Sequence, residues 1–135
     1  MGDLFYFLLA GTSFCLFMSL KTLFTPNQVR GRIVSFENFL FLGMIYFTVL
    51  VGFGMIYLLL GLYAEPVLAD PHAASKQFIH QAESSIYFSA MTLFSVGPGD
   101  VVPLGAGRWI AILEALIGYT IPAAFVAKAV MDWEK

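Results

Sequence analysis

Charge is scarce in this 135-residue chain, because Asp, Glu, Lys and Arg make up 12% of it, whereas a soluble domain carries about 25%. The seven basic residues form no cluster and are outnumbered by nine acidic ones, which excludes the basic face of a nucleic-acid-binding protein. The single cysteine, Cys15, excludes an internal disulfide and a multi-cysteine metal site. Metalloprotease, phosphate-loop and Cys-x-x-Cys motifs are also absent, so the sequence predicts no enzyme.

Apolar residues are abundant instead, at 59% of the chain, and they gather into three long runs at 4–20, 39–63 and 109–127. A bilayer core of ~30 Å is crossed by about 20 apolar residues in a helix. We therefore predict an all-α, multi-pass protein of the cell membrane, surrounded by lipid. The first run is at the short limit, so it either spans or lies along the interface, and we favour spanning.

The distribution of Lys and Arg predicts the orientation of these helices. Three basic residues follow the first run closely, whereas the segment 64–107 holds one basic residue against four acidic ones. Basic loops stay in the cytoplasm, so we place a loop at 25–38 and a tail at 129–135 on the cytoplasmic side. The N-terminal hydrophobic helix, 1–24, then begins outside.

The stretch between the second and third runs contains a short apolar helix and then a Gly- and Pro-rich return. The helix, predicted at 82–94, is too short to span, and the sequence SVGPGDVVPLGAG after it cannot be helical. Irregular backbone at membrane depth is tolerated only where protein encloses it or where it lines a watery cavity. This order is typical of a pore loop. The predicted pore domain, 39–128, comprises an outer helix at 39–63, an external loop at 64–81, a pore helix at 82–94, a filter at 95–100 and an inner helix at 107–128.

The filter segment offers a run of backbone carbonyls from Ser95 to Gly99. Gly97 and Gly99 can adopt a positive φ without penalty, and Pro98 has no N–H but keeps its carbonyl. Alternating conformations of this kind can turn successive carbonyls toward one side. Several copies around an axis would then form oxygen rings that replace the hydration shell of a cation.

At these residues the chain resembles two-transmembrane, pore-loop potassium channels and their non-selective cation relatives. The matching stretches are YFSAMTLFSVGPGDVVP, against a family pattern of roughly T-(V/I)-G-Y-G-D after a pore helix, and GRWIAILEALIGYTIPAAFVAK, which resembles the inner helix. The resemblance implies a homotetramer in which each subunit supplies one quarter of a filter. It also implies K⁺ or Na⁺ as the permeant ions, with no other cofactor and no small-molecule substrate.

The resemblance further assigns roles to individual residues. K⁺ or Na⁺ is expected at Ser95, Val96, Gly97 and Pro98, with Gly99 completing the filter. The Ser95 hydroxyl is expected at the inner mouth, Val96 behind the filter and Asp100 at the outer mouth. Gly118 corresponds to the gating glycine of the inner helix, although a glycine in a membrane helix is more commonly a close-packing position. By helical spacing from it, the residues expected to face the cavity are Tyr119, Pro122 and Val126.

One acidic residue, Glu114, interrupts the third apolar run. A carboxylate at a helix centre costs about 2.5–3.5 kcal/mol on insertion scales, so such residues usually face the protein interior and have a partner. We expect Glu114 to support the filter, as Asp100 does, by hydrogen bonding to the pore helix at Ser89 or Thr92.

Two departures from the family pattern keep a second function open. Pro98 stands where the family has an aromatic residue, and Phe94 stands where it usually has Thr. Pro98 cannot supply the ring that normally holds the filter diameter, so the filter is predicted to be weakly selective, sodium-permeable or closed. The alternative is a channel-like subunit that does not conduct and acts as a regulator or assembly partner. A weaker third option is a membrane sensor that uses the acidic external segment.

Overall fold

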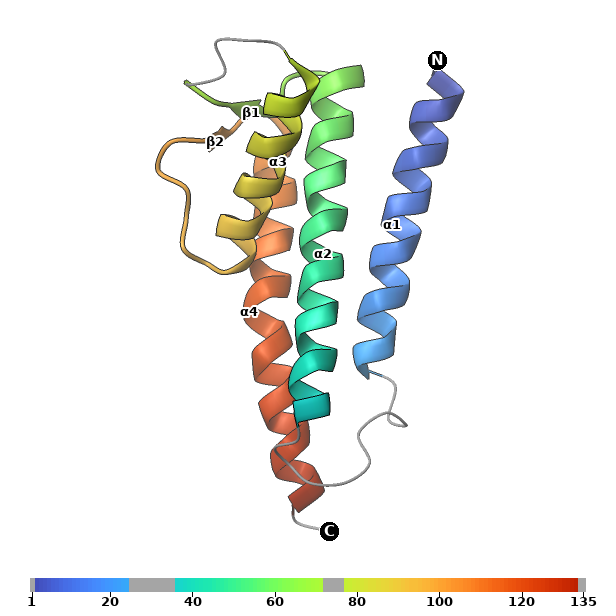
Figure 1. The fold of residues 1–135 in the computed structure, drawn as a ribbon, viewed down its shortest axis with the longest axis vertical. Coiled ribbons are helices and arrows are strands. Elements are labelled where there is room, and N and C mark those ends of the chain that lie inside the picture. The colour runs from blue at the N-terminus through green and yellow to red at the C-terminus, as the bar shows by residue number, and fades with distance from the viewer. Residues whose placement is uncertain (1, 25–35, 72–76, 134–135) are drawn as a thin grey trace.

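The chain folds into long helices with one short re-entrant element, as the computed structural model shows for residues 2–24, 36–71 and 77–133 (Figure 1). The elements, in order, are α1 (Gly2–Phe24), α2 (Phe36–Tyr63), β1 (Leu68–Ala69), α3 (Phe78–Leu93), β2 (Val102–Pro103) and α4 (Ala106–Trp133). The predicted all-α architecture is therefore confirmed. Within the described ranges, three helices are long and apolar enough to cross a membrane: Gly2–Lys21, Phe39–Tyr63 and Ala106–Ala127.

The core forms where α2 meets α3 and α4. On α2, the buried residues Ile45, Val49, Phe53 and Tyr57 recur every four positions, which places them on one face of the helix. They pack in one cluster with Phe88 and Leu93 of α3 and Ile121 of α4. α2 makes its most extensive contacts with α3 and its next most extensive contacts with α1.

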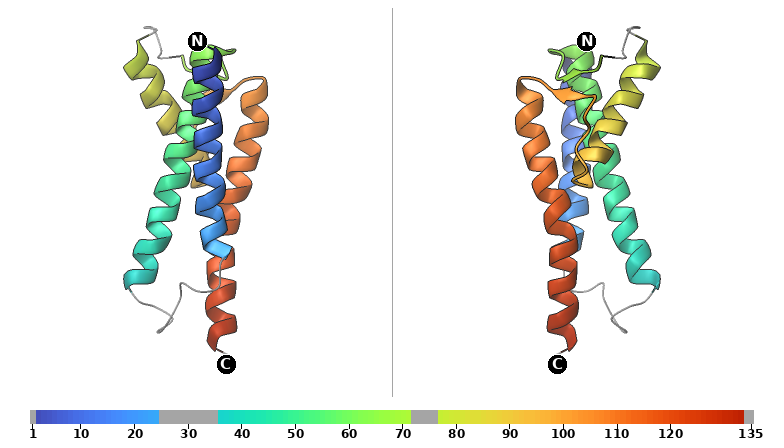
Figure 2. Two further views of the ribbon diagram at one scale, coloured as in Figure 1. Left: turned by 90° about the vertical axis from the view of Figure 1, so that its right-hand side faces the viewer. Right: turned by 90° about the vertical axis from the view of Figure 1, so that its left-hand side faces the viewer.

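The helix α1 lies beside α2 on the far side from α4, and its N-terminus is at the same end of the molecule as α3 (Figures 1 and 2). It presents Leu16, which is buried, to Gly52 of α2. A Cβ atom at Gly52 would lie 2.5 Å from the Leu16 Cδ2 atom, so the absence of a side chain at position 52 lets the two helices approach. This packing alongside α2 agrees with the prediction that the first run spans.

The helix α3 descends only part of the way along α2, and the chain then returns to the same end of the molecule through residues 94–105 (Figure 2). The two ends of this excursion are tied together by β1 and β2, which pair antiparallel with Leu68 opposite Pro103. The Leu104 amide also donates to the Val67 carbonyl at 2.7 Å. Gly107, at the start of α4, lies so close to that carbonyl that a Cβ atom would clash with it.

Several predicted boundaries differ from those in the structure. The pore helix α3 begins at Phe78 rather than 82, so the predicted external loop 64–81 is shorter and contains β1. Gln77 is extended (φ −74°, ψ 135°) and acts as the N-cap, and no Gly or Pro follows it to delay the helix. The filter therefore follows a helix of 16 residues that begins about one turn earlier than expected.

The two long pore-domain helices also extend past their predicted limits of 39–63 and 107–128. α2 begins at Phe36, and α4 continues to Trp133 because no Gly or Pro follows Pro122 to stop it. Most of the predicted cytoplasmic loop, 25–38, lies outside the described residues, as do the last two residues of the predicted tail, 129–135.

Candidate ion filter and its supporting helices

The filter segment begins as the C-terminal cap of α3. The Ser95 amide donates to the Thr92 carbonyl at 3.0 Å, and the Val96 amide donates to the Met91 carbonyl at 2.9 Å. These two bonds, with a left-handed residue between the helix and the return, define a Schellman motif. Ser95 is that residue, with φ 56°, in a position where glycine is usual because a Cβ atom in this conformation costs roughly 1–2 kcal/mol.

In the filter backbone, the N–H groups and the carbonyl groups differ in their described hydrogen bonds. The amides of Ser95, Val96 and Gly97 all donate to carbonyls of α3, and Pro98 has no N–H. By contrast, no hydrogen bond from another described residue reaches the carbonyls of residues 95–99. Most of this segment is exposed, so its carbonyl oxygens are available to a ligand.

Positive φ values occur at alternate positions, as a filter requires, but at a different pair from the one expected. Gly97 has φ 75° and Ser95 has φ 56°, whereas Gly99 is not in the left-handed region. The Schellman cap accounts for the difference, because it fixes the left-handed residue directly after the helix. The conformational freedom of glycine is therefore used at Gly97 only.

Asp100 directly follows the filter segment and is bonded to α3. Its Oδ1 atom accepts a hydrogen bond from the Tyr87 hydroxyl of α3 at 3.2 Å. Partial burial and the adjacent Asp100 carboxylate raise the pKa of the Tyr87 phenol, so this hydroxyl stays protonated and donates at neutral pH. The bond joins the end of the filter to the flank of the pore helix.

Glu114 is fully buried and joins three helices. Its Oε1 atom accepts from the Ser89 hydroxyl of α3 at 2.5 Å, as expected, and its Oε2 atom accepts from the Tyr57 hydroxyl of α2 at 2.8 Å. Ser89 also lies 2.9 Å from the Leu50 carbonyl. We call Tyr57, Ser89 and Glu114 the polar junction. Thr92, the other expected partner, is buried but makes no described hydrogen bond to Glu114.

Gly118 lies one helical turn below Glu114, at the point where α4 meets the end of α3. A Cβ atom at Gly118 would clash with the Leu93 carbonyl, so close packing explains this glycine. Its own carbonyl accepts a hydrogen bond from the Tyr46 hydroxyl of α2 at 2.8 Å. The filter-bearing end of α3 is therefore enclosed between α2 and α4.

Phe94, the aromatic residue directly before the filter, packs against α2. Its ring stacks on that of Tyr46, with centroids 5.6 Å apart and planes 8° from parallel. The Phe94 ring therefore lies between the end of α3 and α2.

The remaining predicted residues are exposed in the single chain. Tyr119 and Val126 are 74% and 59% exposed, and Pro122 is exposed beside them. Val96, expected to brace the filter from behind, is also 64% exposed. Among the described residues, nothing covers this face of α4 or Val96.

Comparison with known proteins assigns the family. The sequence profile of a family described as ion channels matches residues 48–133, which contain most of α2, the whole re-entrant element and α4. The chain belongs to this ion-channel family. Its two-helix, pore-loop pattern is the one predicted from the filter sequence, and α1 lies outside the matched region.

Two bacterial relatives extend the similarity beyond the ion-channel match. The chain is 44% identical over 117 residues to Protein LctB of Bacillus caldotenax, covering 86% of this chain and 87% of that protein. It is 41% identical over 118 residues to Protein LctB of Geobacillus stearothermophilus, covering 87% and 88% respectively. No solved structure gives a significant match.

Sequence reasoning missed two tyrosines that hold the site together, Tyr46 and Tyr57 of α2. A signal was present, because a buried tyrosine usually needs a partner for its hydroxyl and both lie within an uncharged run. Their partners could not be identified from the sequence, since these lie 72 and 57 positions away along the chain.

Proposed function

We propose that this protein is a passive cation channel of the cell membrane, a homotetramer that conducts K⁺ through rings of filter carbonyls from residues 95–99. The observation that carries the proposal is the hydrogen bonding of the filter backbone. Its first three N–H groups donate to carbonyls of α3, whereas its own carbonyls have no described partner. Carbonyl oxygens in this state are suited to replace the hydration shell of a cation. No catalytic role is proposed for any residue.

Assembly of four copies supplies what one chain lacks. One filter strand offers only a quarter of the oxygens that a closed ring needs. The face of α4 turned away from its own chain is mostly apolar where its side chains are described, which suits packing against other copies or lining of a shared cavity. The large apolar residues exposed there are Trp109, Ile112, Leu113, Leu116, Tyr119, Val126 and Val130.

The filter chemistry favours weak discrimination between K⁺ and Na⁺. Pro98 occupies the position at which the resembling channels have an aromatic ring, and its own ring is too small to pack far behind the filter. Val96, which precedes Gly97 in the filter, is 64% exposed among the described residues and so does not brace the filter within its own subunit. We therefore propose that Na⁺ permeates as well as K⁺.

The alternative function is a channel-like subunit that does not conduct. Pro98 is the feature that supports it, because proline limits the conformations available to the filter. The other feature, Phe94, gives it less support than the sequence suggested, since its ring stacks on Tyr46 of α2. Conduction is therefore the function that the geometry supports better.

The deciding experiment is ion flux from liposomes that contain the purified protein. With K⁺ inside, we expect a leak well above that of empty liposomes, and bi-ionic reversal potentials with K⁺ and Na⁺ close to zero. Native mass spectrometry of the same sample should show four copies. A tetramer without any leak would support the non-conducting subunit, and a monomer or dimer would contradict the tetrameric channel.

A matched pair of glycine variants tests whether the leak passes through this filter. Gly97→Ala places a Cβ atom on a residue with φ 75°, whereas Gly99→Ala changes a residue outside the left-handed region; both sites have open space. We expect at least about tenfold less flux from Gly97→Ala, since strain of 1–3 kcal/mol recurs in every subunit. Gly99→Ala should lose less. Equal flux in both variants and the wild type would place conduction elsewhere.

A further inference from the structure

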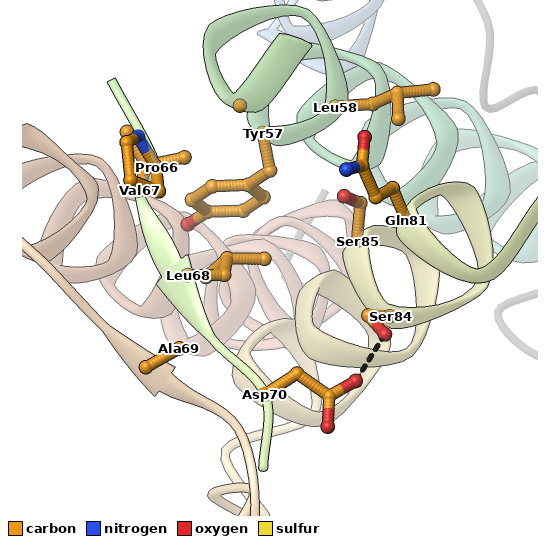
Figure 3. Close-up of a pocket in the computed structure, with 11 residues that line it drawn as sticks. Tyr57, Leu58, Pro66, Val67, Leu68, Ala69, Asp70, Gln81, Ser84 and Ser85 are labelled. Atoms are coloured by element: carbon orange, nitrogen blue, oxygen red, sulfur yellow. Dashed lines mark hydrogen bonds between the residues drawn. The ribbon is translucent and has the colours of Figure 1, made fainter. Parts of the chain in front are cut away.

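A cavity of about 300 Å³ opens at the re-entrant end of the molecule, between α2, α3 and the strand β1 (Figure 3). Its apolar side includes the ring of Tyr57 together with Val67 and Leu68. Its polar side carries Gln81 and Ser85 from the first two turns of α3. The volume is at the lower end of the range for ligand pockets, so the cavity suits a small molecule.

Ser85 places a buried hydroxyl on the polar side of the cavity. This residue is 4% exposed, its hydroxyl points into the cavity in Figure 3, and no hydrogen bond to it is found among the described residues. A hydroxyl can donate one hydrogen bond and accept two, and a buried polar group destabilises the fold while it is unsatisfied. A ligand with a hydrogen-bonding group would satisfy it.

Gln81 adds a second neutral polar group on the same side. It lies four positions before Ser85, and positions four apart share one face of a helix. Gln81 is half-buried, and its side-chain amide has no hydrogen bond in the part of the chain that the structure describes. The amide offers two N–H donors and a carbonyl acceptor. The two side chains therefore present donors and acceptors next to each other without carrying a charge.

These two groups specify a neutral ligand with a hydroxyl, which is the smallest group that both donates and accepts hydrogen bonds. Such a hydroxyl can bond to Ser85 and to the amide of Gln81 at the same time, while the apolar body lies against the ring of Tyr57. We propose that this cavity is a binding site for small, neutral amphipathic alcohols. Asp70 and Ser84, at its edge, bond to each other (Figure 3), and neither takes part in the proposed recognition.

The ring of Tyr57 connects the site to the filter support. It lines the cavity, while the Tyr57 hydroxyl donates to Glu114 in the polar junction. A ligand that contacts the ring therefore contacts the residue that joins α2 to α4. We expect the ion flux to change on binding. This consequence rests on the proposed channel function, whereas the binding itself does not.

The test uses the whole chain in lipid nanodiscs, with 2-phenylethanol as the probe and ethylbenzene, which lacks the hydroxyl, as its counterpart. Titration calorimetry is corrected with empty nanodiscs, because both probes partition into lipid. We expect saturable binding of the alcohol and weaker binding of ethylbenzene. Ser85→Ala should weaken alcohol binding about fivefold, which corresponds to about 1 kcal/mol for one hydrogen bond. It should not weaken binding of ethylbenzene.

A matched pair of glutamine variants locates the site. Gln81→Met removes the amide from the cavity wall and keeps a side chain of similar length, so alcohol binding should again weaken about fivefold. Gln77→Met makes the same change one turn earlier, at the N-cap of α3 and outside the cavity lining. Gln77 is exposed and its side chain makes no capping hydrogen bond, so this variant should keep the wild-type affinity.

The outcomes separate binding from its effect on flux. No saturable alcohol binding by the wild type, unchanged affinity in Ser85→Ala, or equal weakening in Gln81→Met and Gln77→Met would each overturn the site. If binding follows the expected pattern, liposome flux is then measured over a range of 2-phenylethanol concentrations. A flux change that needs about fivefold more alcohol in Ser85→Ala supports the link through Tyr57. Unchanged flux, or the same concentration dependence in both proteins, overturns that link alone. Liposomes without any flux would refute the channel function and leave the binding result standing.

Discussion

Two contact regions of α2 differ in the forces that hold them. On one side, α1 meets α2 through apolar contacts, with Leu16 seated on Gly52. On the other side, α3 and α4 meet α2 through the polar junction of Tyr57, Ser89 and Glu114, and through the bond from Tyr46 to Gly118. In the first region, α1 lies outside the ion-channel match, whereas the second region lies almost wholly inside it.

The difference matters because lipid chains are as apolar as the helices. Within a bilayer, apolar contact alone supplies no hydrophobic driving force between helices, so close packing and interhelical hydrogen bonds must hold them together. The re-entrant element carries a filter whose oxygens must be placed accurately, and it is attached by both means. The described contact between α1 and α2 is apolar packing such as that of Leu16 on Gly52, so we expect α1 to be the more dispensable part.

The largest effect should come from removing the centre of the polar junction. Glu114→Ala leaves the buried hydroxyl of Tyr57 without its acceptor, at a cost of about 1–3 kcal/mol, and leaves Ser89 with the Leu50 carbonyl as its acceptor. We expect a markedly lower melting temperature and little flux from liposomes. Glu114→Gln keeps the shape and a side-chain oxygen, so it should retain assembly and part of the flux. Full stability and flux in Glu114→Ala would show that the junction does not support the filter.

A smaller but clear effect is expected where α4 touches the end of α3. Gly118→Ala inserts a Cβ atom against the Leu93 carbonyl, and overpacking of this kind typically costs about 1–3 kcal/mol. Flux should fall with it, because Leu93 is two residues before the filter. The control is Gly43→Ala in α2, where a Cβ atom meets nothing within 4 Å. If both variants behave alike in flux and thermal melting, Gly118 is not a close-packing site.

The smallest effect is expected at the contact between α1 and α2. Leu16→Ala removes the side chain that covers Gly52, but lipid can take its place. We expect unchanged flux and a loss of stability smaller than that of Gly118→Ala, measured by thermal melting in the same detergent. A loss of flux comparable to that of Glu114→Ala would mean that α1 is as much a part of the pore as α3, and would remove the contrast between the two regions.

The location of the helices and of the filter could be predicted from the sequence because they depend on local properties. Long uncharged runs predict spans, and a Gly- and Pro-rich return after a short helix predicts a re-entrant loop. A lone acid such as Glu114 has to find a partner, and its partner on α3 was correctly expected to be Ser89 or Thr92. The start of α3 was misplaced because Phe78–Gln81 is helical without any strong signal of its own.

The sequence by itself therefore determined that this is a membrane protein with a short helix and a carbonyl-rich turn between two spans, since hydropathy and backbone restrictions act over neighbouring residues. Only the tertiary structure decided that Tyr57 completes the junction, that Phe94 stacks on Tyr46, and that Ser95 rather than Gly99 adopts the left-handed conformation. The physical reason is the range of the interactions. The tyrosines meet partners 48 to 72 positions away, and the conformation of Ser95 follows from the point at which packing lets α3 end.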